Sequence, residues 1–159
     1  MALKTQGTEL FFVDDLTSSV PVIVKVTCPT GVSGLGGAAD QIESTCLNDL
    51  VDKAFVRGLG NPGQVSVPFN LDPQAVSHQL LFDLKDAGTT ISWLAALSDG
   101  TAAPTVIDSD YVITPPAART SFGFLAYVSD VNIDIATNEI VRGTLTLQRS
   151  GVVTPTWKP

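Results

Sequence analysis

The sequence predicts a mainly β protein: an antiparallel β-sandwich or barrel with one flanking α-helix and a long inter-strand loop. Residues 64–70 alternate strictly between apolar and polar side chains, which is the period of a half-buried strand. Residues 131–135 and 141–148 alternate in the same way on either side of a short loop, as in a hairpin with one wet face. Residues 72–88 alone carry a convincing helical spacing of apolar side chains.

Two strands are expected near the N-terminus. Residues 9–13 form a short apolar run between Gly7 and a pair of aspartates. Residues 20–28 place valines and then Cys28 at every second position, and their β-branched side chains favour extended backbone. Pro21 lies near the start of this segment, where a strand tolerates a missing donor.

Residues 29–63 are punctuated by glycine and proline and predict a long loop, with at most a short helix over 43–51. Loops of this length are uncommon in a compact domain unless they are functional or disordered. Disorder is the alternative, but the segment is too apolar for a solvated linker. We expect it to order against its own domain or a neighbour through side chains that include Leu35, Ile42, Leu47, Leu50, Val51, Phe55, Val56 and Leu59.

The helix is expected to open with Asp72 as the N-cap and Pro73 at its first position, and to end at Gly88. Its apolar stripe consists of Val76, Leu80, Leu81, Leu84 and Ala87. His78 lies within the helix, but the sequence nominates no nucleophile or orienting group for it. We therefore expect a packing or solvent-facing role for this histidine.

The last third of the chain is rich in strand signals. Strands are expected at 89–97, 111–113, 121–135 and 140–149, with turns between them. Residues 152–159 contain Pro155 and Pro159, which favour an arm over a strand of the core.

Length and composition indicate one domain that spends much of its surface on other subunits. The chain has 159 residues, of which 44% are hydrophobic and 16% charged, against a usual charged share of about 25%. The formal net charge is −7, which argues against a protein that grips DNA by neutralising phosphates. No run of eighteen apolar residues and no signal-peptide pattern is present, so no membrane contact is expected and the chain should stay in the cytoplasm.

The sequence offers little for chemistry. Cys28 and Cys46 are the only cysteines, and we expect both to be reduced, buried thiols; His78 cannot complete a tetrahedral metal site with them. Residues 34–37 lack the spacing of a dinucleotide loop, and no phosphate-loop lysine follows them. Asp108 and Asp110 are poor candidates for acid–base work, because such pairs beside a strand are usually solvated. No enzyme activity, cofactor or metal is expected.

An ordered set of segments resembles the major tail tube proteins of long, non-contractile-tailed (siphovirus-type) bacteriophages. No one segment is a chemical signature, but together they span nearly the whole chain. The set consists of residues 5–10, 28–31, 34–40, 45–49 and 58–64, the helix opening at 72–73, Trp93, and the terminal strand at 147–151.

The resemblance implies a β-sandwich in one domain, 1–159, of which six copies close into a ring whose inner strands form a continuous barrel. Rings stack into a hollow tube in the virion tail, assembled in the host cytoplasm. The terminal arms, 1–8 and 152–159, help to lock rings, and the loop 29–63 reaches an adjacent ring through Leu35, Ile42, Leu47, Leu50, Phe55 and Leu59. The implied partners are further copies and the tape-measure, tail-tip and tail-terminator proteins.

The polar sides of the last two strands are candidates for the channel wall, because closure across subunits opens an aqueous lumen. Between positions 86 and 134 there are six acids and one base, so this stretch carries five of the seven excess negative charges. Such a wall repels phosphates and lets DNA pass without specific binding; alternatively, the acids only keep the outer surface soluble. The candidate lumen-facing residues are Asp130, Asn132, Asp134, Arg142, Thr144, Thr146 and Gln148.

Two other functions stay open at this point. A β-sandwich that binds a cell-surface glycan requires exposed aromatic side chains, and the candidates are Trp93, Trp157, Tyr111 and Tyr127. A hydrolase would have to use His78.

Overall fold

The computed structural model describes residues 2–17, 19–106 and 111–159, so Asp108 and Asp110 lie outside the described residues. The described part contains ten strands and one helix. In chain order these are β1 (Glu9–Asp14), β2 (Val22–Lys25), β3 (Ala39–Glu43), β4 (Phe55–Gly60), β5 (Gln64–Asn70), α1 (Val76–Ala87), β6 (Ile91–Ala96), β7 (Thr105–Val106), β8 (Ile113–Thr114), β9 (Ser121–Asp134) and β10 (Arg142–Thr156).

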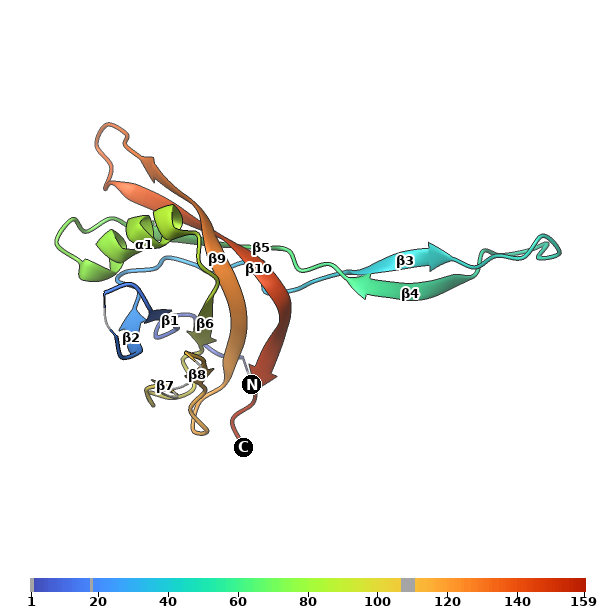
Figure 1. The fold of residues 1–159 in the computed structure, drawn as a ribbon, viewed down its shortest axis with the longest axis horizontal. Coiled ribbons are helices and arrows are strands. Elements are labelled where there is room, and N and C mark those ends of the chain that lie inside the picture. The colour runs from blue at the N-terminus through green and yellow to red at the C-terminus, as the bar shows by residue number, and fades with distance from the viewer. Residues whose placement is uncertain (1, 18, 107–110) are drawn as a thin grey trace.

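One six-stranded antiparallel sheet forms the body of the protein, in the order β2-β1-β6-β9-β10-β5. The two longest strands, β9 and β10, curve across its middle, and α1 packs against one face (Figure 1). Two small ribbons, β3–β4 and β7–β8, complete the fold. The predicted class, mainly β with antiparallel sheets and one flanking helix, is confirmed.

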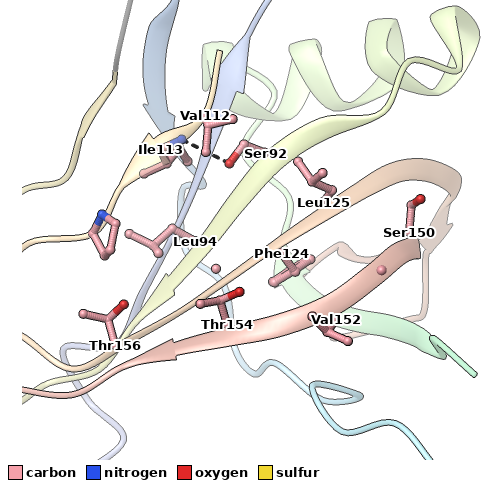
Figure 2. A pocket seen from close by; sticks show the side chains of 13 residues that line it. Ser92, Leu94, Val112, Ile113, Phe124, Leu125, Ser150, Val152, Thr154 and Thr156 are labelled. Atoms are coloured by element: carbon pink, nitrogen blue, oxygen red, sulfur yellow. Dashed lines mark hydrogen bonds between the residues drawn. The ribbon is translucent and has the colours of Figure 1, made fainter. Parts of the chain in front are cut away.

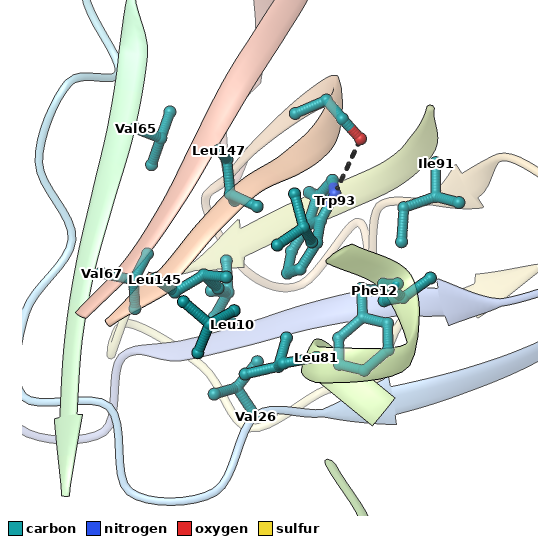
Figure 3. Close-up of a cluster of buried hydrophobic side chains, with 14 of the residues drawn as sticks. Leu10, Phe12, Val26, Val65, Val67, Leu81, Ile91, Trp93, Leu145 and Leu147 are labelled. Carbon is teal, nitrogen blue, oxygen red and sulfur yellow. Dashed lines mark hydrogen bonds between the residues drawn. The ribbon is translucent and has the colours of Figure 1, made fainter. Parts of the chain in front are cut away.

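The main core lies between α1 and the sheet. Leu81 of the helix, Phe12, Trp93 and Leu145 are all fully buried there (Figure 3). The Trp93 indole donates a hydrogen bond to the carbonyl of Ala126 over 3.2 Å, so its polar atom is satisfied inside the core. Each side chain of this size contributes about 1.5–3 kcal/mol on burial. The apolar positions of the alternating strands β5 and β10 therefore lie in the core beneath the helix; they are Val65, Val67, Phe69, Leu145 and Leu147.

The opposite face of the sheet is covered over only half its width. A second cluster, consisting of Phe11, Val13, Leu94, Ala96 and Ile113, packs where β8 crosses β1 and β6. Among the described residues, no element covers the part of this face formed by β5, β9 and β10, which carries mainly polar side chains. This half-covered sheet is the feature that positions the candidate channel wall.

The helix begins later than predicted. It starts at Val76 with Ala75 as its N-cap and has no side-chain cap, so the assignment of Asp72 and Pro73 to the helix start is wrong. Asp72 instead forms a turn, in which its carboxylate accepts from the Gln74 N–H at 3.0 Å and its carbonyl from the Ala75 N–H at 3.1 Å. A side-chain oxygen that satisfies a local amide suits a turn as well as a cap.

The end of the helix and the centre of its stripe follow the prediction. Gly88 has a φ of 66° and donates to the carbonyl of Leu84 at 3.0 Å, which is the predicted left-handed cap. Leu80, Leu81 and Leu84 are buried. Val76 and Ala87 are exposed, because they lie at the two ends of the helix, so these two assignments are wrong.

Two predicted N-terminal and central strands are shorter in the structure. The strand predicted over 20–28 is limited to β2, and both Val20 and Val22 are more than 40% exposed. The strand predicted at 111–113 begins only at Ile113, because Tyr111 has a φ of 51°. The strands at 9–13, 64–70 and 89–97 are confirmed as β1, β5 and β6.

The segment 29–63 is largely ordered, and it contains no helix. Residues 29–33 lie along the outer edge of β5, with bridges between Pro29 and Phe69 and between Ser33 and Ser66. Gly34 has a φ of 90°, and a Cβ there would meet the Gln64 carbonyl at 2.0 Å, so only glycine fits. The predicted helix over 43–51 is wrong, because β3 and β4 form an antiparallel hairpin that projects away from the sheet (Figure 1).

The C-terminal residues also form more structure than predicted. β10 continues to Thr156 and pairs with the start of β9, through Thr154 with Gly123 and Thr156 with Ser121. The expectation that residues from 152 onward form no strand is therefore wrong. Pro155 is tolerated because β5 ends at Gln64, which leaves this part of β10 as an edge without a second partner in the main sheet.

Candidate assembly surfaces

The polar face is the uncovered side of β5, β9 and β10. The register pairs Arg142 with Asp134, Thr144 with Asn132 and Thr146 with Asp130 across β9 and β10. The structure thus brings together six of the seven residues predicted to line the channel. The seventh, Gln148, lies on the same side of β10, but it is half-buried and its amide reaches the Pro62 carbonyl at 3.4 Å.

The charge on the polar face is close to neutral rather than strongly acidic. Asp130 lies 3.4 Å from Lys85 of α1, and Asp134 accepts from the Asn132 amide at 3.3 Å. Two of the six acids counted in the sequence lie elsewhere: Asp86 is on α1, and Asp99 is in a turn. The face therefore presents mainly hydroxyls and amides, with few charges that could hold phosphate.

The hairpin β3–β4 carries apolar side chains on both of its faces. Its strands have no packing partner within the described part of the chain, and an isolated two-stranded hairpin is only marginally stable in water. Seven large apolar side chains are more than half exposed along it: Ile42, Leu47, Leu50, Val51, Phe55, Val56 and Leu59. Such a surface calls for a partner outside the chain.

Five of the six residues predicted to contact an adjacent ring lie on this hairpin, and Leu35 does not. Leu35 is half-buried and packs against the main core, before the hairpin begins. The tip is held by backbone bonds, including Ser44 N–H to the Ala54 carbonyl at 2.8 Å, and by the Asp49 carboxylate, which accepts from the Cys46 N–H at 2.8 Å.

The two termini are fastened to one corner of the sheet (Figure 1). Arg119 is buried there and donates to the Glu9 carboxylate and to the Gly7 carbonyl, each at 2.7 Å. Hydrogen bonds from Arg119, and then from Lys25, hold the pKa of Glu9 below its ordinary value of 4.5. The buried cation therefore pins the N-terminal segment where β1 begins.

The C-terminal segment ends at the same corner. The Thr120 N–H donates to both carboxylate oxygens of Asp99, at 3.0 and 3.1 Å, and hydrogen bonds from Thr120 lower the pKa of Asp99. Lys158 donates its backbone N–H to the Thr120 hydroxyl at 3.2 Å and its ammonium to the Asp99 carbonyl at 2.7 Å. Sequence reasoning missed this corner, because its partners come from both ends and the middle of the chain.

A groove of about 450 Å³ lies between the β7–β8 ribbon and the second half of β10 (Figure 2). Its walls come from four strands and include Leu94, Val112, Leu125 and Val152, with Thr154 at one side. None of the described residues that line it has a titratable side chain.

His78 is buried and engaged on both sides of its ring. Nδ1 accepts from the Asp72 N–H at 3.0 Å, so Nε2 carries the proton and donates to the Thr27 carbonyl at 2.7 Å. The ring also packs on Phe69, with centroids 4.7 Å apart. The packing role is confirmed, and a substrate has no access to this histidine.

The other candidates for binding, which are aromatic and thiol side chains, do not gather at one site in the described structure. Trp93 is fully buried, Trp157 packs edge-on against Phe122, and the Tyr111 hydroxyl donates to the Ser19 carbonyl at 3.4 Å. Cys28 and Cys46 are free and exposed, so the expectation of buried thiols is wrong: both lie on irregular segments, outside the packed sheet.

Over residues 2–17, 19–106 and 111–159, no three His, Cys, Asp or Glu side chains gather in a way that could hold a metal ion. The helix of the described structure is too short and too polar to cross a bilayer.

Comparison with known proteins identifies the family of the chain. The family model described as phage tail tube, TTP, lambda-like matches residues 1–159. Structural protein 3 of Pseudomonas phage PAJU2 is 38% identical over 152 residues, which are 94% of this chain and 90% of that protein.

Solved structures share the fold at low identity. A subunit of the SPP1 tail tube superposes with a TM-score of 0.66 at 11% identity, over 99% of this chain and 80% of that one. A chain from the sheath/tube terminator of an extracellular contractile injection system gives 0.69 at 14% identity, over 99% and 98%. A chain from the tail of a gene transfer agent particle gives 0.66 at 11% identity, over 98% and 100%.

The polar face and the projecting apolar hairpin are surfaces suited to a subunit that joins other copies. The family model matches residues 1–159, so it covers both surfaces. The chain belongs to the lambda-like family of phage tail tube proteins, and it is a structural subunit of a virion tail.

Proposed function

We propose that six copies of this chain close into a ring and that the rings stack into the hollow tube of a long, non-contractile tail. The polar face of β5, β9 and β10 lines the channel, and DNA passes along it without specific binding. The ends of the tube meet tape-measure, tail-tip and tail-terminator proteins. The role is structural and involves no catalysis or cofactor.

The observation that carries this proposal is the hairpin. Leu47 at its tip is fully exposed, and Leu50 and Val51 are more than 90% exposed, although each is a residue type that usually lies inside a protein. Burying three such side chains in a neighbouring ring removes a large apolar area from water at each contact. The segment 2–8 and residues 157–159, held at one corner, are placed to contribute further contacts between copies.

Excision of the hairpin tests the proposal. The Asn61 N–H donates to the Ala38 carbonyl at 2.9 Å, so the two ends of the segment 39–60 lie side by side. Deleting 39–60 and joining Ala38 to Asn61 through two glycines should leave the body folded, because residues 29–34 keep their contacts with β5. We expect a cooperative thermal transition like that of the full chain, together with a loss of long tubes in electron micrographs.

Two results contradict the proposal. If the excised protein forms tubes of normal length, the hairpin does not join rings. If the full chain stays monomeric at high concentration with the native tail-tip complex supplied, stacked rings are not its assembled form. Loss of the thermal transition on excision would instead place the hairpin in the chain's own folding core.

A further inference from the structure

Arg149 is a buried cation for which the described residues provide no counter-charge. It is 4% exposed and follows Leu145 and Leu147 on the core side of β10, at the point where β5 ends. Within the described residues no carboxylate lies within 4.0 Å of it, since the four ion pairs there involve Lys25, Lys53, Lys85 and Arg119. An arginine cannot shed its proton inside a protein, so its burial requires compensation by an anion or by hydrogen bonds.

The hydrogen bonds that Arg149 makes are incomplete. Its Nη2 donates to the Gly36 carbonyl, whereas its Nε is buried and has no acceptor. A Cβ at Gly37 would stand 3.1 Å from Nη2, so the absence of a side chain there makes room for the guanidinium. The glycines at the base of the hairpin thus leave space for the Arg149 guanidinium, whose capacity to donate hydrogen bonds is only partly used.

A pocket of about 320 Å³ lies beside the Arg149 guanidinium and these glycines. Residues 35–37 and 60–62 at the base of the hairpin form one side, and residues 149 and 151–153 of β10 form the other. The exposed Arg57 of β4 also lines the pocket, and no described carboxylate lies within 4.0 Å of it either. Two arginines and no acid therefore face one cavity in a chain whose net charge is −7.

We propose that Arg149 and Arg57 form an anion-binding site for a carboxylate, which an acidic side chain of an adjacent copy supplies in the tube. A carboxylate fits the planar fork of a guanidinium and accepts charge-assisted hydrogen bonds from it. Sixteen acidic residues against nine basic ones give every copy unpaired carboxylates to offer. The identity of the partner rests on the proposed function, whereas the anion site itself does not.

The first experiment tests the site in the monomer. The side-chain Nε–H signals of both arginines are followed by NMR during titration with sodium acetate, with sodium chloride at equal ionic strength as the reference. We expect acetate to shift both signals and chloride to shift neither. The absence of any acetate-specific shift overturns the site, whether or not the protein polymerises.

The second experiment tests the partner. Arg149→Met keeps the apolar stem and removes the charge, and Arg57→Gln changes an exposed position that cannot unfold the core. Each loses a charged hydrogen bond across the interface, so we expect polymerisation to slow by about tenfold, at an unchanged thermal transition of the monomer. Lys25→Met removes an exposed cation on β2, at the opposite edge of the sheet from β10 and β5; it serves as the matched control and should polymerise normally.

The outcomes separate the two claims. If acetate shifts the signals but both arginine variants polymerise like the wild type, the site takes only a free anion, and the adjacent copy is not its partner. Sodium phosphate that competes with acetate and blocks polymerisation supports a shared site. If the wild type forms no tubes at all, the ring proposal fails, while the acetate titration still decides the anion site.

Discussion

At the scale of single residues, the stability of the corner that holds both termini depends on Arg119. Its guanidinium reaches Glu9 and three backbone carbonyls, so each of its three nitrogens donates a hydrogen bond although the charge is taken out of water. Arg149 differs, because its bonds are incomplete within one chain. One buried arginine therefore stabilises the monomer, and the other is available to an assembly.

Glu9→Gln should lower the free energy of unfolding at pH 7 by about 2 kcal/mol, because it removes the charged partner of a buried guanidinium. The folded-state pKa of Glu9 lies below its ordinary value of 4.5. The stability that the Glu9 carboxylate contributes is therefore complete above about pH 4.5, and it declines as the pH falls through the folded-state pKa. Urea unfolding at pH 7 and pH 3 should show the gap between wild type and variant narrowing in acid.

The control for this prediction is Glu43→Gln. The carboxylate of Glu43 meets Lys53 at 3.4 Å on the exposed hairpin, where an ion pair contributes between 0 and about 1 kcal/mol. A Glu9→Gln variant no less stable than Glu43→Gln would show that Arg119 is satisfied by its carbonyl partners alone.

At the scale of elements, the contact between β10 and β5 depends on a glycine under an aromatic ring. Gly143 pairs with Phe69, and a Cβ at this glycine would lie 2.4 Å from the ring. Phe69 in turn packs on His78 of α1, so the ring cannot move without disturbing the helix. The three elements are thus locked at one point.

Gly143→Ala should destabilise the monomer by about 1–3 kcal/mol through this overpacking. Gly60→Ala is the matched control, since nothing lies within 4 Å of its Cβ position and its expected effect is within about 0.5 kcal/mol. Chemical denaturation of the two variants measures the difference. Equal stabilities would mean that Phe69 has room to turn aside.

At the scale of the whole molecule, the two faces of the sheet have different surroundings. One face is covered by α1 and contains the main core, and the polar face of β5, β9 and β10 is the proposed channel wall. Its near-neutral surface, in which Arg142 is a cation among hydroxyls and amides, offers phosphates little counterion release. For the proposed channel, low friction for DNA therefore follows from the scarcity of cations rather than from strong repulsion.

Adding lysines to the polar face should therefore slow DNA ejection and make it sensitive to salt. Thr144→Lys combined with Thr146→Lys places two cations per copy on the proposed wall, repeated around every ring. Tails of normal length with slower ejection at low salt are expected in particles that carry this variant. Gln79→Lys on the exposed side of α1 is the control, and equal ejection rates for the two would place the channel wall elsewhere.

Part of this organisation is local and could be predicted. The alternation over 64–70 predicted β5 and its buried side, and the alternation over 131–135 did the same for the end of β9, because a period of two assigns a face once a strand forms. The polar residues of β9 and β10 are opposite one another because a short loop joins two antiparallel strands. The candidate channel wall followed from these local patterns.

Other parts depended on distant contacts and could not be predicted. The hairpin occupies a segment whose glycines and prolines resemble a loop, and its exposed apolar side chains lack the alternation of a half-buried strand. Asp72 carries the residue type of a helix cap but serves a turn, which His78 holds from within the helix. Arg119 and Arg149 have partners more than 80 residues away along the chain, so no spacing indicates them.

The sequence by itself determined most strands of the sheet, the single helix and the polar and apolar sides of the strictly alternating strands, because these follow from side-chain period and turn chemistry. The tertiary structure decided which strands have a free edge, which face stays uncovered and which arginine is buried without a counter-charge. These properties depend on what packs against each residue. Packing and desolvation are set by segments far apart in the chain.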